Sequence, residues 1–377
     1  MSENPGFLLT VLAFLLVLGP LVFLHELGHY LAGRWFGVKA EEFSIGFGRE
    51  LTGWTDKRGT RWKLCALPLG GYVLFAGDMN PASQPDAEWL ALPPEERART
   101  FPAKPVWQRA IIVAAGPAMN FLIAILILGG FAYAYGESRT PALVGAVEPQ
   151  SVAAAAGLQP GDRITRLSGR AIDTFGDMVD YVRMRPSEAV RIELVRGGVA
   201  RSVEARIGVA VERDRFGNEY RLGRLGIAPG EPEIRTVGLI EAPWVGLKLT
   251  GRVLENQIAA IGQIISGRRS VSELGGPLRI AKISGEQLSL GLAAFITLIA
   301  IISINLGFIN LLPVPMLDGG HLMFYAIEAV QRRPVAPQVM EWAYRGGLAA
   351  VLGLMLLVTF NDLGAFGLWR GLAGLIG

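Results

Sequence analysis

The residues with the clearest chemical meaning are His25, Glu26 and His29, which form the pattern His-Glu-x-x-His. On a helix, side chains four residues apart project from one face, so the two histidines can share one zinc ion. A carboxylate that follows the first histidine can reach a water at that metal and act as a general base. The chain has 3 histidines in all, so two at this spacing are informative. The pattern predicts a zinc-dependent hydrolytic site, and the competing interpretation is two histidines packed in a core.

The composition indicates a membrane protein. Of 377 residues, 51% are hydrophobic and 18% are charged, and the mean hydropathy is +0.37. Soluble proteins carry about 25% charged residues. The net charge of +3, from 36 basic and 33 acidic residues, leaves no dominant basic field for a nucleic acid. With one cysteine, Cys65, a disulfide framework and a cysteine-built zinc finger are excluded.

Four segments are apolar enough to be transmembrane helices. We expect them at residues 7–24 with the turns that follow, 109–137, within 286–318, and 346–361. The fourth is short, so it either includes residues 340–344 or tilts little. The alternative for the first is a signal peptide, but residues 1–6 hold no Lys or Arg and no small-residue cleavage site follows. Ionisable residues inside a span are costly and by default functional, which argues against histidines of the core.

The distribution of Lys and Arg predicts the orientation of these spans, because cytoplasmic loops carry an excess of both. The segment between spans one and two is rich in them, the loop between spans three and four adds more, and the N-terminal tail has none. The residues concerned are Arg34, Lys39, Arg49, Lys57, Arg58, Arg61, Lys63, Arg97, Arg99, Lys104, Arg109, Arg332, Arg333 and Arg345. We therefore expect both loops in the cytoplasm, and the N-terminus, residues 137–286 and the C-terminus outside.

A catalytic zinc takes three protein ligands plus water, so a third ligand must come from elsewhere in the chain. The other intramembrane acid is Asp318, and the remaining histidine is His321. Pro313 and Pro315 cannot continue the third helix and would break it near its end, which the predicted topology puts on the side of the two histidines. We therefore expect Asp318 at their level, with His321 as the competing ligand.

Residues 143–229 alternate short apolar runs with Gly, Pro and mixed charge. This pattern predicts strands and helices. The expected strands are 144–147, 163–167 and 190–195, and the expected helices are 151–156 and 176–184. The spacing Ala156-Gly157-Leu158-x-x-Gly161-Asp162-x-Ile164 resembles a bacterial PDZ domain.

In PDZ domains an edge strand accepts a peptide, and loop amides take the carboxylate of the peptide. Residues 222–228 resemble that loop and strand in the permuted bacterial form, which implies that Gly223, Leu225, Gly226 and Ile227 form the peptide groove. The alternative is a spacer or size filter. Residues 244–265 have the apolar spacing of a helix that lies either on the outer membrane face or on the PDZ-like unit.

These features together resemble the site-2 protease family of intramembrane zinc metalloproteases, in particular its bacterial regulator of sigma-E protease branch. The resemblance rests on His-Glu-x-x-His in the first span, on Asn310-x-x-Pro-x-Pro-x-Leu-Asp-Gly closing the third, and on the PDZ-like insert. Residues 67–73 and 114–121 also match. The best-known members of the branch carry two tandem PDZ domains, whereas one such pattern is present here, so substrate gating is left open.

The resemblance implies that His25, His29 and Asp318 bind one Zn²⁺ ion per chain while Glu26 activates water, and that Asn310 helps to hold the substrate. It further implies a substrate-binding role for the residues of two neighbouring segments. These are Pro313 and Pro315, which would shape a loop, and Gly70 and Gly71, in a stretch that resembles a membrane-associated β-hairpin or re-entrant segment. An unwound substrate strand would pair with that stretch, since a helical peptide bond is shielded by its own hydrogen bonds.

The function that this implies is an intramembrane zinc metalloendopeptidase of regulated intramembrane proteolysis. It would cut single-span membrane proteins within or near the transmembrane segment, after an extracytoplasmic protease has trimmed them. Anti-sigma factors or remnant signal peptides are the substrates that family analogy implies. We also expect the protein to contact membrane lipid, and we expect no nucleic acid among its partners. The expected place is the bacterial inner (cytoplasmic) membrane, with the PDZ-like domain outside the cytoplasm and the active site near the cytoplasmic side.

The alternative function is a non-catalytic membrane adaptor that holds client helices through its PDZ-like domain. Glu26 argues against it, because a scaffold needs no carboxylate between two zinc ligands. A metal transporter would need a second polar span, which the sequence lacks.

The predicted fold class is a polytopic α-helical membrane protein with about four transmembrane helices, a membrane-associated β-hairpin or re-entrant segment and an inserted α+β PDZ-like domain. The predicted domains are a first membrane part at 1–136 with a cytoplasmic loop at 37–105, a PDZ-like domain at 137–230, an extracytoplasmic amphipathic helical linker at 231–286, and a second membrane part at 287–377.

Overall fold

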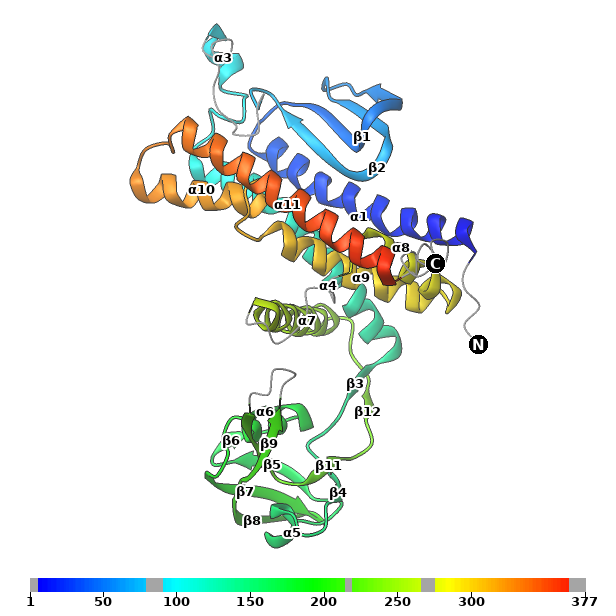
Figure 1. The fold of residues 1–377 in the computed structure, drawn as a ribbon, viewed down its shortest axis with the longest axis vertical. Coiled ribbons are helices and arrows are strands. Elements are labelled where there is room, and N and C mark those ends of the chain that lie inside the picture. The colour runs from blue at the N-terminus through cyan, green and yellow to red at the C-terminus, as the bar shows by residue number, and fades with distance from the viewer. Residues whose placement is uncertain (1–5, 79–90, 214–218, 266–274, 366–377) are drawn as a thin grey trace, which may run out of the picture. The chain divides into compact units, whose positions relative to one another are not determined.

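The computed structural model describes residues 6–78, 91–213, 219–265 and 275–365 (Figure 1). The parts of the predicted domains that fall on other residues lie outside this description. The described chain forms two compact units. The first draws on residues 6–78, 91–129, 243–261 and 275–365, and the second contains residues 130–213 and 219–242 with 262–265.

Four helices of the described chain are long and apolar enough to cross a membrane. They are α1 (Phe7–Trp35), α4 (Val106–Tyr135), α9 (Leu292–Asn310) and α11 (Pro337–Ala365). All four predicted spans are therefore present. The fourth begins at Pro337 and includes residues 340–344, so it is longer than its uncharged core suggested.

Four further helices complete the first unit or join it to the rest of the chain. They are α3 (Pro94–Arg97), α7 (Ala242–Ile265), α8 (Pro277–Ser289) and α10 (Asp318–Gln331). Gln257 of α7 donates a hydrogen bond to Asn305 of α9. This contact with a membrane helix favours the first of the two interpretations of residues 244–265, a helix on the membrane face.

A buried carboxylate joins α11 to α8. Asp362 is 3% exposed, and it accepts hydrogen bonds from the backbone amides of Gly276 (3.1 Å) and Arg279 (3.0 Å) at the start of α8. Amides in the first turn of a helix have no partner within the helix, and a negative charge there is favourable. No local sequence pattern predicts this contact, because Gly276 and Asp362 are 86 residues apart.

Strands β1 (Ala40–Thr55) and β2 (Arg61–Phe75) both bend, so that together they form a curled sheet. Residues 42–45 pair with 71–74 on one side and with 61–64 on the other, and 61–64 also pair with 52–55. The sheet packs on α1 through Phe43, which is fully buried, stacks on Trp62 and meets Tyr30 edge-on. The predicted hairpin is present, and residues 71–74 form one of its outer strands.

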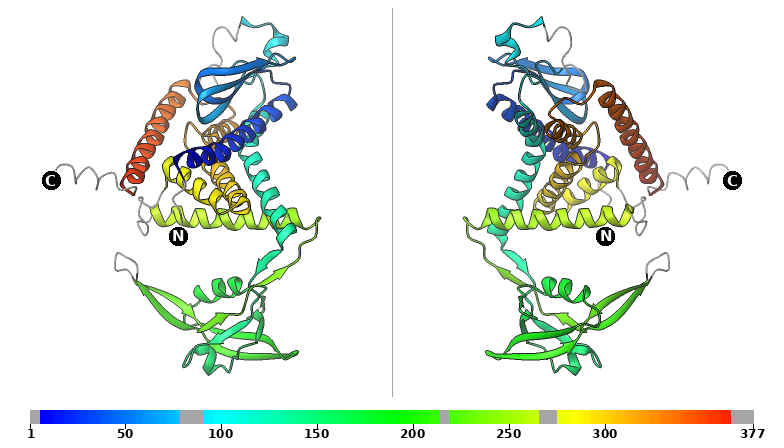
Figure 2. Two further views of the ribbon diagram at one scale, coloured as in Figure 1. Left: turned by 90° about the vertical axis from the view of Figure 1, so that its right-hand side faces the viewer. Right: turned by 90° about the vertical axis from the view of Figure 1, so that its left-hand side faces the viewer.

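The second unit consists of short strands with two helices, one of which, α6, lies along one side of the strands (Figures 1 and 2). Its strands and helices are β4 (Val144–Val147), α5 (Val152–Ala155), β5 (Arg163–Leu167), β6 (Arg170–Ala171), α6 (Phe175–Arg183), β7 (Ala189–Arg196), β8 (Val199–Arg206), β9 (Gly208–Arg213), β10 (Glu219–Arg224) and β11 (Ile227–Pro229). One sheet has the order β6-β5-β7-β8, β9 pairs with β10, and β4 pairs with β11. Alternate residues of β7 are buried, namely Val190, Ile192 and Leu194, as expected for a strand with one face on a core.

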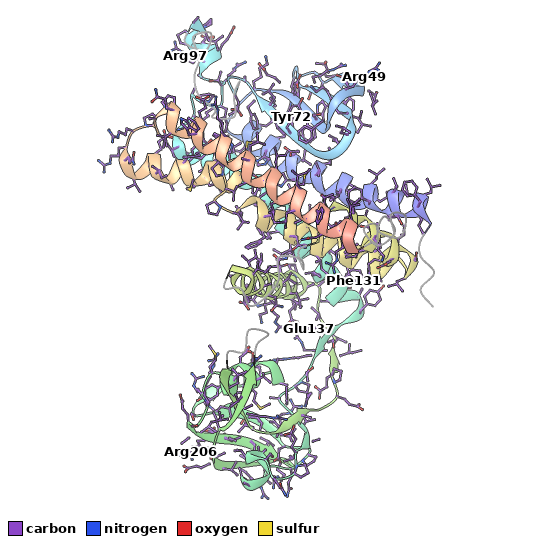
Figure 3. All side chains as sticks on the ribbon, viewed as in Figure 1. Arg49, Tyr72, Arg97, Phe131, Glu137 and Arg206 are labelled. Carbon is purple, nitrogen blue, oxygen red and sulfur yellow. The ribbon has the colours of Figure 1, made fainter. Side chains whose placement is uncertain are left out.

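The segments that enter and leave this unit pair with each other. β3 (Glu137–Arg139) and β12 (Glu233–Arg235) are antiparallel. Arg235 forms ion pairs with Glu137 (2.9 Å), which is labelled in Figure 3, and with Glu241 (2.8 Å).

Inside the second unit, Asp162 is fully buried. Its two carboxylate oxygens accept hydrogen bonds from Arg196 at 2.6 and 2.7 Å, and Oδ2 also accepts one from the Gln159 amide at 2.9 Å. The Arg196 guanidinium beside it holds the pKa of Asp162 below the ordinary value of 3.8. The Asp162 carboxylate of the Gly161-Asp162 motif thus links the turn before β5 to Arg196 of β7.

Replacing Asp162 with Asn should destabilise the second unit by about 1.5–3 kcal/mol, the usual contribution of hydrogen bonds to a charged group. Because the folded pKa of Asp162 is lowered, its stabilisation is complete above about pH 4 and is lost as the pH falls further. Amide hydrogen exchange of β5 and β7 in the full-length protein measures both effects. Asp173, which is exposed and 3.8 Å from Arg139, is the control, and an equal loss from Asp173→Asn would contradict this account.

Candidate metal centre

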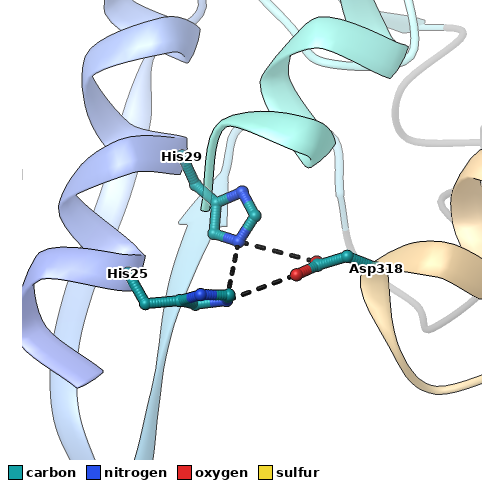
Figure 4. Close-up of side chains that lie close together, drawn as sticks. All are labelled: His25, His29 and Asp318. Carbon is teal, nitrogen blue, oxygen red and sulfur yellow. Dashed lines mark hydrogen bonds and ion pairs between the residues drawn. The ribbon is translucent and has the colours of Figure 1, made fainter. Parts of the chain in front are cut away.

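His25 and His29 lie one turn apart on α1, and Asp318 approaches them from the first turn of α10 (Figure 4). The Nε2 atoms of His25 and His29 are 3.3 Å apart. Oδ2 of Asp318 is 3.2 Å from His25 Nε2, and Oδ1 is 3.5 Å from His29 Nε2. The structure therefore brings together the three residues predicted to be zinc ligands.

These separations fit a single zinc ion. Ligand atoms about 2.0–2.2 Å from a tetrahedral zinc lie about 3.3–3.6 Å from one another. The Nδ1 atom of His29 is 2.9 Å from the carbonyl oxygen of Ile112, which can only accept a hydrogen bond. Nδ1 therefore carries the proton, and the lone pair on Nε2 is free for a metal. Two imidazoles and one carboxylate are a ligand set of catalytic zinc, which keeps its fourth position open.

Helix α4 presents one face to the two histidines. Ile112, Gly116 and Asn120 are four residues apart and so lie on the same side of the helix. Ile112 contributes its carbonyl, a Cβ at Gly116 would overlap the His29 ring, and Asn120 Nδ2 lies 3.0 Å from His25 Nδ1. Residues 114–121 resemble the family in sequence, but that resemblance predicted no role for any of them. The four-residue spacing of Ile112, Gly116 and Asn120 puts them on one face of a helix but does not show which helix that face meets.

Helices α1 and α4 are in backbone contact beside this face. A Cβ at Gly28 would overlap the carbonyl oxygen of Ala115. Gly28 stands between Glu26 and His29 in the metal-binding pattern, and its importance cannot be seen without the second helix.

A tight turn between α9 and α10 positions the Asp318 carboxylate. As expected, the two prolines interrupt the helix, since α9 ends at Asn310 and α10 begins at Asp318. Met316 has φ +93°, a conformation that costs roughly 1–3 kcal/mol outside glycine. A Cβ at Gly319 would overlap the carbonyl oxygens of Leu311 and Leu312, which directly follow α9. Asp318 therefore opens a separate helix, which corrects the expectation that it closes the third span.

Glu26 and three of the predicted substrate-binding residues line one cavity, whereas the two predicted prolines do not. Glu26 is 8% exposed and lines a cavity of about 430 Å³ together with Gly70, Gly71 and Asn310. Asn310 Nδ2 is 3.4 Å from His25 Nε2. Pro313 and Pro315 are not among the residues that line this cavity.

His321 lines the same cavity but lies outside the cluster of converging ligand atoms in the described chain. Its ring nitrogens are 3.0 and 3.2 Å from the hydroxyl of Tyr344 on α11. His321 therefore has no ligand position in this geometry, and its side chain joins α10 to α11 instead.

The four predicted groove residues lie together in the second unit. Gly223, Leu225, Gly226 and Ile227 line a cavity of about 360 Å³, which is also lined by apolar residues of α6. Those residues are Phe175, Met178, Val179 and Val182.

The fold and the metal centre define a class, a polytopic membrane zinc metalloprotease with an inserted PDZ-like domain. The sequence matches the model of peptidase family M50 over residues 13–354. The chain belongs to this family, which is that of the site-2 proteases.

Curated relatives match over nearly the whole chain. One from Agrobacterium fabrum, named "Putative zinc metalloprotease Atu1380", is 44% identical over 94% of this chain and 95% of its own length. The metalloprotease MmpA of Caulobacter vibrioides is 39% identical over 98% of this chain and 99% of its own. Among solved structures, the PDZ domain of an SdrC-like protein from Listeria monocytogenes matches 25% of this chain and 90% of its own, with 21% identity and a TM-score of 0.19.

Replacing Gly116 with Ala should weaken zinc binding roughly 10- to 100-fold, the cost of losing the support of a metal-binding histidine, because the added Cβ displaces the His29 ring. Alanine is otherwise the better helix former by about 1 kcal/mol. Zinc per chain after competition with a chelator measures the effect. Gly130→Ala on the same helix, where a Cβ meets nothing within 4 Å, is the control. Full zinc retention by Gly116→Ala would refute the close approach.

Proposed function

We propose that this protease hydrolyses a peptide bond within or near the transmembrane segment of single-span membrane proteins. The observation that carries the proposal is the place of the metal centre. His25 and His29 lie within α1, a helix apolar enough to span a membrane, and His25 and Glu26 are both less than 10% exposed. A substrate of such a site is expected to reach it from within the bilayer.

The residues of the cavity suit hydrolysis. When bound by His25, His29 and Asp318, zinc supplies a Lewis acid that polarises a carbonyl and lowers the pKa of water to about 7. Glu26 faces the same cavity and is placed to take a proton from water and to pass it to the leaving amine. The Asn310 amide, close to His25, can donate a hydrogen bond to the oxygen on which negative charge develops.

The outer strand of the curled sheet is suited to hold the substrate. Gly71 lies so close to the catalytic base that a Cβ on it would be 3.1 Å from Glu26 Cγ. Residues 71–74 pair with the sheet on one side only among the described strands. An unwound substrate can add to such an edge by backbone hydrogen bonds, which exposes a peptide bond beside Glu26.

We further propose the bacterial inner membrane as the location, with the metal centre near the cytoplasmic side and the PDZ-like unit outside. The excess of Lys and Arg in residues 34–109 supports this orientation. Substrates would then be proteins already trimmed outside by another protease, such as an anti-sigma factor or a remnant signal peptide. The adaptor alternative gives no role to a carboxylate that lines the metal cavity.

The cavity beside α6 is proposed to bind a peptide end. Apolar side chains of α6 line it, and so do Arg224 and Glu148, which pair at 2.6 Å. This arrangement suits an extended segment with an apolar last side chain and a free carboxylate.

Glu26→Gln should reduce cleavage of a tagged model transmembrane substrate about 10²- to 10⁴-fold, the usual contribution of a general base, while zinc stays bound. Asp318→Asn should lose activity and also hold zinc more weakly, because a carboxylate ligand is removed. Purified wild type and both variants are compared in detergent, with product and bound zinc measured on the same samples.

Cleavage by Glu26→Gln at the wild-type rate would overturn the enzymatic role of Glu26. If no protein binds zinc, the metal centre itself is wrong. If wild type holds zinc but cuts nothing, the proposed substrate class is contradicted and the adaptor alternative gains.

Val179→Asp should weaken binding of a labelled peptide with an apolar, free C-terminus at least about tenfold, since a charge would enter the apolar wall of the cavity. Fluorescence anisotropy with the full-length protein measures the affinity. Ala200→Asp adds the same charge at an exposed position of β8, outside the cavity. Equal affinities for wild type and Val179→Asp, or for free and amidated peptide, would contradict the groove.

A further inference from the structure

Asn120 is the polar side chain of α4 that faces the metal centre. It is fully buried, and its carboxamide nitrogen lies 3.0 Å from His25 Nδ1. Its carboxamide oxygen is buried as well and has no hydrogen-bond partner among the described residues. The backbone of Asn120 is held separately, since its carbonyl accepts a hydrogen bond of 2.8 Å from Ser303 of α9.

The chemistry of His25 sets a requirement for this contact. Its Nε2 atom faces Asp318 and the Nε2 of His29, so Nε2 is the atom that can bind the metal. A neutral imidazole that binds through Nε2 carries its proton on Nδ1 and needs a hydrogen-bond acceptor there. A carboxamide nitrogen cannot accept, whereas a carboxamide oxygen can.

The carboxamide can satisfy this requirement by a half-turn. Its oxygen and nitrogen ends have nearly the same shape, and which end faces a neighbour is decided by hydrogen bonding. Because Oδ1 has no partner where it now lies, no hydrogen bond of that atom opposes the exchange. After the half-turn, Oδ1 meets the Nδ1 proton of His25 at the same short distance.

We propose that Asn120 is a positioning residue of the metal centre, whose Oδ1 accepts the Nδ1 proton of His25 in the zinc-loaded protein. This contact fixes the tautomer and the ring orientation of His25, as the Ile112 carbonyl does for His29. One face of α4 then supports both histidine ligands. The proposal rests on the zinc centre and not on the identity of the substrate.

Three variants of the full-length protein test the proposal. Asn120→Leu keeps about the same size but removes the acceptor, and should weaken zinc binding roughly 10- to 100-fold. Asn120→Asp keeps an acceptor and should bind zinc at least as tightly as wild type. Ser303→Ala removes the neighbouring hydrogen bond to the Asn120 backbone and should leave zinc affinity unchanged.

The readouts are the zinc dissociation constant by chelator competition and the visible absorption of the Co²⁺-substituted protein, which reports ligand geometry. The Asp variant should keep the wild-type spectrum, and the Leu variant should change it. Wild-type affinity in Asn120→Leu would overturn the proposal, as would equal losses in the Leu and Asp variants or in the Leu and Ser303→Ala variants.

Thermal unfolding of the metal-free proteins distinguishes a loss of histidine positioning from a loss of folding stability. Equal melting temperatures of chelated wild type and Asn120→Leu would show that packing is intact, so that a weaker zinc affinity supports the proposal. If Asn120→Leu does not fold, Asn120→Asp decides: retained zinc and spectrum support the acceptor role, and their loss overturns it. Because zinc is measured directly, a wrong substrate leaves these results unaffected.

Discussion

The metal centre depends on the contact between the backbones of α1 and α4. Gly28 has no side chain, so α1 can lie against the carbonyl of Ala115. At this distance the Ile112 carbonyl and the Asn120 side chain are within hydrogen-bonding reach of the two imidazoles. A wider separation would leave both rings free to turn and their Nδ1 protons without acceptors. The spacing of the histidines supplies the ligands, but the helix contact holds them in the orientation that a metal requires.

The third ligand depends on a different constraint, which is the turn between α9 and α10. Three features bring Asp318 back toward α1: the end of α9 before the prolines, the unfavourable backbone of Met316 and the close approach at Gly319. Strain of this kind persists only where the surrounding packing determines it. Here the surrounding contacts include the one between His321 and Tyr344, which fastens α10 to α11 directly behind the ligand.

Local patterns predicted much of this architecture, and contacts between distant segments account for the rest. The His-Glu-x-x-His spacing indicated the site, and the apolar runs indicated the four spans. Asp318 was indicated by two prolines that end the third helix and by the distribution of Lys and Arg, which puts that end on the side of the histidines. Residues 67–73 were matched to the family, but the pairing of residues 71–74 with 42–45 depends on register and could not be read from their composition. The roles of Gly116, Asn120 and Asp362 arise where helices cross, and no periodicity within a single helix reports which residues of another helix it will meet.

The paired strands β3 and β12 have a consequence for how such a protein can change over evolutionary time. Because Glu137 and Arg235 face each other, the inserted unit begins and ends at the same place. A segment whose two ends adjoin can be exchanged, duplicated or lost without a rearrangement of the chain on either side. Selection can therefore alter the inserted unit while the zinc-binding helices keep their sequence. The inserted unit and the metal centre become separately heritable parts of one polypeptide.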